Sequence, residues 1–276
     1  MSRCRRPIGL AALALFLAAC ALAPAAGPSS PAAPTPGARA GQALSPDGSP
    51  ASTISVPILM YHYIRVNPDP ADRLGAGLSV KPDDFRSQMD WLAESGFHPV
   101  HLSQVHAYFD HGEPLPPQPV VLTFDDGYAD FYSAALPILR AHGFRAVAYL
   151  VPGFLDTPGY LTRDQVRSLE ANGVEVGSHT LTHPDLTSLH GARLVHEVAD
   201  SGRQLADLVG HPVLAFCYPS GRWNQEVVDQ VRQAGYLSAT TTQEGREHTW
   251  AARYTWARVR VAGGEALPDF ARALSV

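Results

Sequence analysis

Two short segments of this chain carry side chains that can bind a metal ion or transfer a proton. Asp125 and Asp126 stand side by side after the apolar run 120–124, and His179 and His183 follow a second apolar run. Such runs predict buried strands, and the carboxyl ends of parallel strands gather at one edge of a sheet. Two imidazoles and one carboxylate form an open site for a divalent metal ion. We therefore expect a metal site at this edge, unless one aspartate only caps the following helix.

The elements that must position these residues alternate along the chain from residue 54 onward. Strands are expected at 54–63, 97–100, 120–124, 146–151, 174–178, 213–218, 236–241 and 254–261. Helices are expected at 82–95, 102–109, 128–142, 162–171, 190–209, 224–234 and 266–274. Parallel strands need crossover connections, which are right-handed. This alternation favours an α/β fold with a closed or nearly closed (β/α) barrel of about seven strands, and an open doubly wound sheet is the alternative.

The spacing of the two histidines also predicts their local structure. His179 and His183 are four positions apart, so a helical turn after the strand would place both imidazoles on one face. No glycine-rich dinucleotide fingerprint or P-loop follows any expected strand. The sequence therefore indicates chemistry that rests on a metal ion rather than on a nucleotide.

The amino terminus has the pattern of an export signal. A basic start and an apolar stretch occupy residues 1–19, which is too short for a transmembrane helix. Leu17-Ala18-Ala19-Cys20 resembles a bacterial lipobox, which implies cleavage before Cys20 and lipidation of that residue. Residues 20–53 are rich in Ala, Pro, Gly and Ser and predict a flexible tether. We expect a single domain over residues 54–276, held at the cell envelope by the lipid and most plausibly at the outer membrane facing the periplasm.

Charge and cysteine content narrow the set of partners. The formal net charge is −5 and no basic patch is present, which argues against nucleic acid as a partner. Cys217 is the only cysteine after residue 20, so the domain cannot form an internal disulfide. We expect the domain to be a monomer.

Three motifs together resemble a known family of enzymes. They are TFDDG at 123–127, SHTLTH at 178–183 and Tyr218-Pro219-Ser220-Gly221, each at the end of an expected strand. The set is similar to the polysaccharide deacetylases of carbohydrate esterase family 4, over nearly all of residues 54–276. The resemblance implies a distorted (β/α) barrel and metal-dependent removal of N-acetyl groups from amino sugars.

The resemblance also implies a role for each motif residue. It makes Asp125 the catalytic base and assigns the metal ion, zinc first and cobalt, nickel or manganese as alternatives, to Asp126, His179 and His183. A carboxylate that binds the metal cannot also accept a proton from water, so two are needed. The segment Tyr218, Pro219 and Ser220 is expected to contact the substrate and to supply a backbone N–H to the oxyanion.

Two departures from the family pattern change the expected assignments. Cys217 stands where the family commonly has an arginine, and the usual carboxy-terminal Leu-x-His is absent after residue 248. His62, at the end of the first strand, resembles the general acid of the poly-β-1,6-N-acetylglucosamine deacetylase subgroup. Arg258 in the last strand is expected to replace the missing arginine beside Asp125, with Arg260 on the same face as the alternative.

The expected substrate is an acetylated polysaccharide that contains N-acetylglucosamine, with a poly-β-1,6-linked chain as the first candidate. Peptidoglycan, chitin-like oligomers and O-acetyl esters on another polysaccharide stay open, because the same site could act on each. Aromatic side chains near strand ends could stack on sugar rings or simply pack: Tyr61, Tyr63, Tyr128, Tyr218 and Trp223. The alternative class is a glycan-binding lipoprotein without turnover, for which Cys217 is the one supporting feature.

Overall fold

The structure, a computed structural model, describes residues 51–274 of the 276-residue chain. The expected signal peptide, the lipidation site Cys20 and the tether up to residue 50 lie outside the described residues. Among residues 51–274, no helix has both the length and the apolar character needed to cross a membrane.

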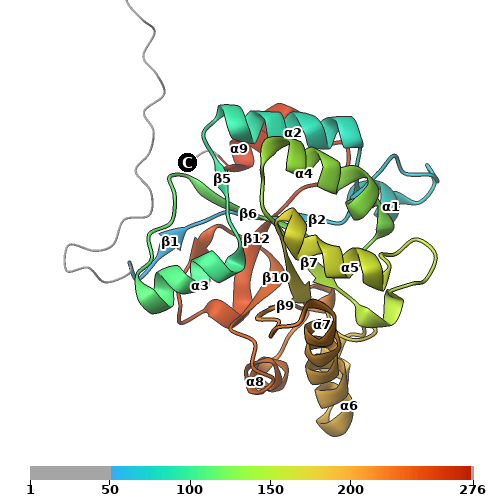
Figure 1. Cartoon of the computed structure of the whole chain (residues 1–276), viewed down its shortest axis with the longest axis vertical. Helices are drawn as coiled ribbons and strands as arrows, with labels where there is room; N and C mark the ends of the chain where they lie inside the picture. Colours follow the sequence, from blue (N-terminus) through green and yellow to red (C-terminus); the bar gives the residue numbers. More distant parts are fainter. Residues whose placement is uncertain (1–50, 275–276) are drawn as a thin grey trace, which may run out of the picture. The chain divides into compact units, whose positions relative to one another are not determined.

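Seven parallel strands form a closed barrel (Figure 1), as the sequence predicts. In order around the barrel the strands are β2 (Ile58–Tyr61), β12 (Trp256–Arg260), β10 (Ser238–Glu244), β9 (Ala215–Cys217), β8 (Val174–Ser178), β7 (Ala146–Leu150) and β6 (Pro119–Phe124). Pairing of β2 with β6 closes the ring, with Ile58 opposite Val121 and Tyr61 opposite Phe124. The short strand β5 (His98–Pro99) pairs with the start of β6. First and last strands are therefore neighbours, which brings β2 and β12 to the same side of the barrel as β6.

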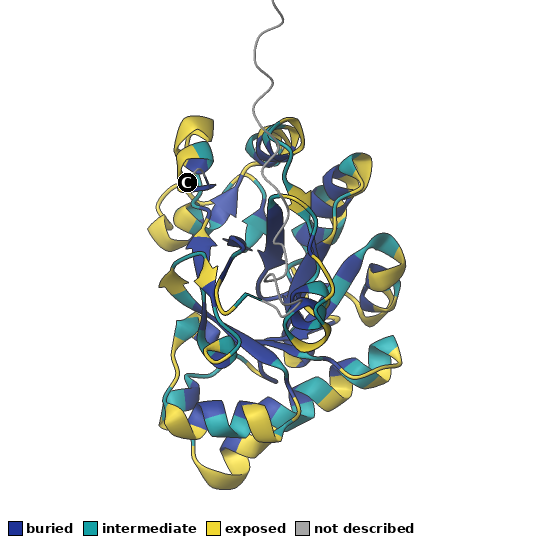
Figure 2. Ribbon diagram, turned by 90° about the vertical axis from the view of Figure 1, so that its left-hand side faces the viewer, coloured by how far each residue is buried: buried dark blue, intermediate teal, exposed yellow. Residues whose placement is uncertain are grey.

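Side chains alternate between the inside and the outside of the barrel. In β6 the outward-facing Leu122 and Phe124 belong to the large apolar cluster under the helices, whereas Val121 belongs to a second cluster together with Tyr149 and Cys217. Figure 2 shows most of the barrel strands buried, apart from some strand ends, and the helices exposed along their outer faces. Since successive residues of a strand point to opposite faces, the second cluster and the polar residues in register with it fill the barrel interior.

Helices cover the outside of the barrel and pack their apolar stripes against it. They are α1 (Arg73–Leu78), α2 (Pro82–Glu94), α3 (Leu102–His111), α4 (Leu136–His142), α5 (Arg163–Leu169), α6 (Gly191–Val195), α7 (Ser201–Val209), α8 (Gln225–Gln233) and α9 (Leu267–Leu274). Thr162 caps α5, where its hydroxyl accepts the N–H of Gln165 in a capping box. Asn224 caps α8 through its side-chain oxygen, which accepts the N–H of Val227.

The structure departs from the expected elements at several places, among them the expected helix at 128–142, which contains the π-helical turn η1 (Phe131–Ala135) before α4. The first strand is divided into β1 (Ile54–Ser55), β2 and β3 (Tyr63–Ile64), and β3 pairs with β4 (Ser79–Val80). β1 pairs with β11 (Glu247–His248), a strand that the local pattern does not predict. The expected helix at 190–209 is interrupted by a π-helical turn, η5 (His196–Asp200). The sequence does not predict this turn, because the spacing of apolar residues does not reveal a one-residue insertion in a helix.

Candidate active site

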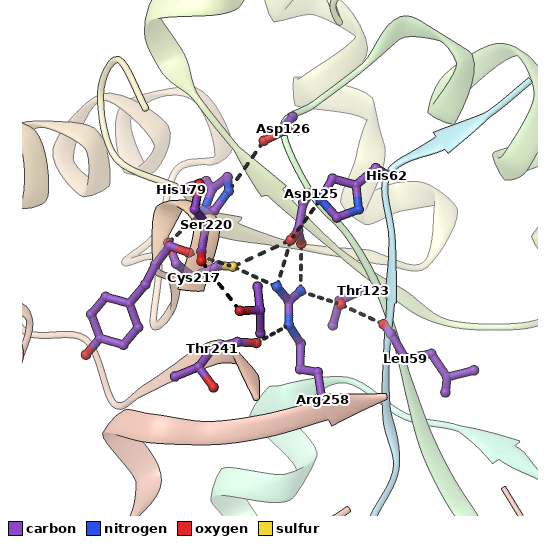
Figure 3. A network of polar contacts seen from close by, with 12 residues as sticks. Leu59, His62, Thr123, Asp125, Asp126, His179, Cys217, Ser220, Thr241 and Arg258 are labelled. Carbon is purple, nitrogen blue, oxygen red and sulfur yellow. Dashed lines mark hydrogen bonds and ion pairs between the residues drawn. The ribbon is translucent and has the colours of Figure 1, made fainter. Parts of the chain in front are cut away.

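A buried ion pair lies at the centre of the site (Figure 3). Nη1 of Arg258 donates to Oδ1 of Asp125 at 2.8 Å, and Nη2 donates to Oδ2 at 2.7 Å. The side chains are 0% and 2% exposed. Thr123 and Thr241 accept further hydrogen bonds from the same guanidinium, at 3.0 and 2.8 Å. The two-residue period of β6 places Thr123 and Asp125 inside the barrel, where β12 presents Arg258.

The arginine keeps the carboxyl group of Asp125 ionised. Burial alone would raise the pKa of Asp125, but the charge and the two hydrogen bonds of Arg258 outweigh it and hold this pKa well below its usual range. The same pairing raises the pKa of Arg258 despite complete burial. Asp125 is thus an unprotonated carboxylate in a dry environment, the state that a general base requires.

The arginine expected to compensate for Cys217 does lie beside the aspartate. The thiol of Cys217 is 3.2 Å from Nη2 of Arg258 and 3.7 Å from Oδ2 of Asp125. Arg258 thus reaches Asp125 from β12, beside position 217, where the family commonly has an arginine. Both oxygens of Asp125 are therefore paired although residue 217 is a cysteine. Arg260, the alternative, ends β12 with an exposed side chain.

The expected metal ligands converge on one another. Oδ1 of Asp126 lies 3.4 Å from Nε2 of His179 and 3.4 Å from Nε2 of His183. It is buried and has no hydrogen-bond partner. The Nδ1 group of His179 donates to the carbonyl of Cys217 at 2.7 Å, which directs the Nε2 lone pair toward Asp126. An orphaned carboxylate oxygen faced by two imidazole nitrogens fits a divalent cation.

A second donor set shares one histidine with the first. One donor atom each from Asp125, His179 and Cys217 lies within 4.8 Å of the others, as holds for Asp126, His179 and His183. Both oxygens of Asp125 already accept hydrogen bonds from Arg258, whereas Oδ1 of Asp126 has no partner. The set that contains Asp126 is therefore the better candidate for the metal site.

The prediction that a helical turn joins the two histidines was wrong. Residues 179–183 form a loop in which Thr180 and His183 have φ values of 67° and 63°. The hydroxyl of Thr180 accepts the N–H of His183 at 2.9 Å, and the two imidazole rings lie 4.8 Å apart at 70°. The left-handed backbone, rather than helical spacing, brings the rings together, and such conformations in non-glycine residues cluster at functional sites.

His62 reaches the site from the loop between β2 and β3. Its Nε2 lies 3.8 Å from Oδ2 of Asp125, and its side chain is 15% exposed. Burial is the largest influence and lowers the pKa of His62, against the opposing charges of Asp125 and Asp126. The imidazole is therefore placed where it could exchange a proton with Asp125, and it is mainly neutral near pH 7 before substrate binds.

The third motif is less open to substrate than the sequence suggests. The ring of Tyr218 is fully buried and its hydroxyl donates to the carbonyl of Tyr254 at 2.9 Å. Its backbone N–H donates to the carbonyl of Thr240 at 3.1 Å, and Pro219 has no N–H. Of the three expected residues, Ser220 (φ 53°) keeps a backbone N–H that could serve as the oxyanion donor.

The aromatic residues divide into core and rim. Tyr61 and Tyr218 are core residues, and the hydroxyl of Tyr61 donates to Gln88 at 3.0 Å, so neither lines an open cleft. Tyr63 stacks on Tyr128 with ring centroids 3.6 Å apart, and Trp223 is 36% exposed.

Sequence reasoning missed two residues near the site. Thr123, which bonds Arg258, could have been found, because it shares a strand face with Asp125. Tyr160, whose ring lies 5.2 Å from that of Tyr128, sits in a loop with no local signal.

Comparisons with known proteins find that polysaccharide deacetylases are similar to this chain. Residues 112–239 match the family model described as polysaccharide deacetylase. The Bacillus subtilis protein named "Putative polysaccharide deacetylase YxkH" is 29% identical over 209 residues, which are 76% of this chain and 72% of that protein. The Streptococcus pyogenes deacetylase PplD, solved in complex with acetate, is 28% identical with a TM-score of 0.75, covering 81% of this chain and 99% of that structure.

A third similarity is partial. The poly-β-1,6-N-acetyl-D-glucosamine N-deacetylase of Escherichia coli K12 is 38% identical over 119 residues, which are 37% of this chain. The match spans only 18% of that relative's length.

Proposed function

We propose that this chain, which is similar to polysaccharide deacetylases, is a metal-dependent hydrolase that removes N-acetyl groups from a polysaccharide containing N-acetylglucosamine. The observation that carries this proposal is that two adjacent carboxylates, Asp125 and Asp126, have different partners. Asp125 is held ionised by Arg258, and the adjacent Asp126 turns an unpartnered oxygen toward His179 and His183. A protein that only bound glycan would gain nothing from a second carboxylate that lies beside the metal ligands and does not itself bind the metal.

The division of labour follows from the contacts. Asp126, His179 and His183 would hold the divalent metal, which supplies Lewis-acid polarisation of the amide carbonyl and lowers the pKa of water. Two imidazoles and a carboxylate suit zinc, and cobalt, nickel or manganese would fit the same donors. Asp125 accepts the proton of the attacking water, and Arg258 keeps it ionised until then. We assign the backbone N–H of Ser220 the stabilisation of the oxyanion, because the N–H of Tyr218 is already bonded and Pro219 has none.

His62 is the proposed general acid. The leaving amine must gain a proton when the C–N bond breaks, and Nε2 of His62 is the imidazole nitrogen facing Oδ2 of Asp125. A neutral His62 can take the proton that Asp125 received from water and pass it to the leaving nitrogen. Arg258 makes protonated Asp125 a strong acid, so transfer in that direction is favourable. This path balances the protons without any further donor.

The substrate and the location are the finer parts of the proposal. The similarity to the E. coli enzyme over 119 residues and the placement of His62 support a poly-β-1,6-linked N-acetylglucosamine chain. The lipobox-like segment ending at Cys20 supports a lipid anchor in the cell envelope, at the outer membrane facing the periplasm. Replacement Cys20→Ser should release the chain from the membrane fraction, and continued membrane association would overturn the anchor.

Acetate release tests the activity itself. The purified full chain is treated with chelator, reloaded with zinc, cobalt or nickel, and offered a β-1,6-linked N-acetylglucosamine oligomer, a chitin oligomer, peptidoglycan and an O-acetylated xylan. Metal-dependent release from one N-acetylated glycan would support the proposal and name the substrate. Release from the O-acetylated polymer alone would identify an esterase, and no release from a folded, metal-loaded chain would overturn catalysis.

A further inference from the structure

A buried glutamate outside the three motifs holds the loop that carries His183. Glu197 is 8% exposed and lies on the π-helical turn η5 between α6 and α7. Its Oε2 accepts the backbone N–H of Thr182 at 2.9 Å, and its Oε1 accepts the hydroxyl of Thr182 at 2.7 Å. Within the part of the chain that the structure describes, this carboxylate has no ion-pair partner. Its charge is therefore stabilised mainly by the residue directly before His183.

The same turn fixes the loop through the backbone. The carbonyl of Glu197 accepts the N–H of Leu181 at 3.1 Å, and the carbonyl of Leu181 accepts the N–H of Gly153 at 2.9 Å. A Cβ atom at Gly153 would lie 2.5 Å from that carbonyl, so only glycine permits the approach. The loop is thus clamped from η5 on one side and from residue 153 on the other.

This clamp works against a backbone that is unfavourable on its own. Thr180 and His183 both have positive φ, a conformation that is unfavourable for non-glycine residues and persists only where the surrounding structure enforces it. Thr182 lies between them, and its backbone N–H and its hydroxyl both donate hydrogen bonds to the carboxylate of Glu197. A one-residue π-helical insertion re-aims the side chains of a helix, and here it lies where Glu197 meets the loop.

We propose that Glu197 is a positioning residue for the metal site: it holds the 180–183 loop in the conformation that aims Nε2 of His183 at Asp126. The proposal rests on the proposed function only in taking Asp126, His179 and His183 as the metal ligands. Partners that orient metal ligands without touching the metal typically change affinity by about 10- to 100-fold when removed.

Zinc titration of the chelator-treated full chain, followed by calorimetry, tests this role without any substrate. Glu197→Ala should weaken zinc binding by about 10- to 100-fold. Glu197→Gln should keep wild-type affinity, because its oxygen can accept the N–H of Thr182 and its amide can donate to the hydroxyl. Glu175 provides a matched control, since its Oε2 accepts both the N–H and the hydroxyl of Ser103, 3.0 and 2.7 Å away, near the start of β8 and thus at the opposite end of that strand from His179. Glu175→Ala should lower thermal stability and leave zinc affinity unchanged.

If Glu197→Ala does not fold, Thr182→Val and Thr182→Ser carry the test. The valine removes the hydroxyl that Glu197 binds and should weaken zinc binding, whereas the serine should not. Wild-type zinc affinity in a folded Glu197→Ala or Thr182→Val variant, or equal weakening in Glu175→Ala, would overturn the proposal. A chain that binds zinc as described but releases no acetate would contradict the proposed function and leave the role of Glu197 intact.

Discussion

Removal of the guanidinium of Arg258 should both destabilise the fold and disable the base. In Arg258→Met the carboxylate of Asp125 stays buried but loses two hydrogen bonds and its countercharge, leaving His62 at 3.8 Å and the thiol of Cys217 at 3.7 Å. Breaking one half of a buried ion pair costs about 3–5 kcal/mol, because the remaining charge is uncompensated. We expect a loss of this size in the free energy of unfolding at pH 7, measured by urea denaturation.

The pH dependence of that loss has a defined sign. In the wild type Arg258 holds the pKa of Asp125 below its unfolded value, so this pair stabilises the fold above about pH 4. In Arg258→Met burial acts without its main opponent and raises the pKa of Asp125. The carboxyl group can then take up a proton on mild acidification, and the difference in stability between variant and wild type should shrink as the pH falls.

Activity should respond to the same change. Without Arg258 the carboxylate loses the two hydrogen bonds that orient it, and a larger fraction of it is protonated and unable to accept a proton from water; general base catalysis contributes about 100- to 10,000-fold. We expect kcat/KM for acetate release to fall by at least about 100-fold at pH 7, with its acidic limb displaced to higher pH. Arg258→Lys retains the charge without the two-pronged hydrogen bonding and should lie between the two.

A double variant separates the ion pair from packing. Asp125→Asn together with Arg258→Met removes both charges, so the double variant should be more stable than Arg258→Met alone, although it is inactive. An Arg258→Met protein with wild-type stability and an unchanged pH–rate profile would refute the reasoning. So would a double variant less stable than the single one by the full cost of Asp125→Asn, because that would show no coupling between the two residues.

Three further predictions follow from other contacts. Asp125→Asn should abolish acetate release while zinc binding, measured by calorimetry, persists, whereas Asp126→Asn should lose both; retained zinc binding in the latter would contradict the ligand assignment. His62→Ala should lower kcat by about 100- to 10,000-fold with zinc affinity unchanged, and full activity would exclude it as the acid. Burial lowers the pKa of both His106 and His248 to about 4, so each contributes stability that is complete above about pH 6.5 and is lost as the pH falls toward 4, about 3 kcal/mol apiece. Urea denaturation at pH 7.5 and 5 should show about 2 kcal/mol of this loss per histidine, because pH 5 lies above the native pKa, and glutamine at both positions should flatten it. An equally steep pH dependence in that variant would rule these histidines out as its source.

The order of the elements and the location of the chemistry are readable from the sequence because they are local properties. Each barrel strand overlaps an apolar run, with ends that differ by up to a few residues, and the strand predicted at 174–178 has those bounds in the structure. Adjacent aspartates after one run and paired histidines after another are visible without knowledge of the fold. The alternation of strand and helix also predicts a parallel sheet covered by helices, but it fits an open sheet as well as a barrel, and the pairing of β2 with β6 decides for the barrel.

The contacts that tune the site depend on the tertiary structure. Asp125 and Arg258 are 133 positions apart, and only barrel closure, which brings β6, β2 and β12 together, decides that Arg258 rather than Arg260 meets the carboxylate. The left-handed turn at His183 is enforced by Glu197, a residue whose local sequence predicts an ordinary helix position. Tyr218 likewise belongs to the third motif, but its ring is buried and its hydroxyl bonds the carbonyl of Tyr254, which is distant in sequence. Local patterns determine which side chains reach the edge of the barrel, and long-range packing decides how each one is held there.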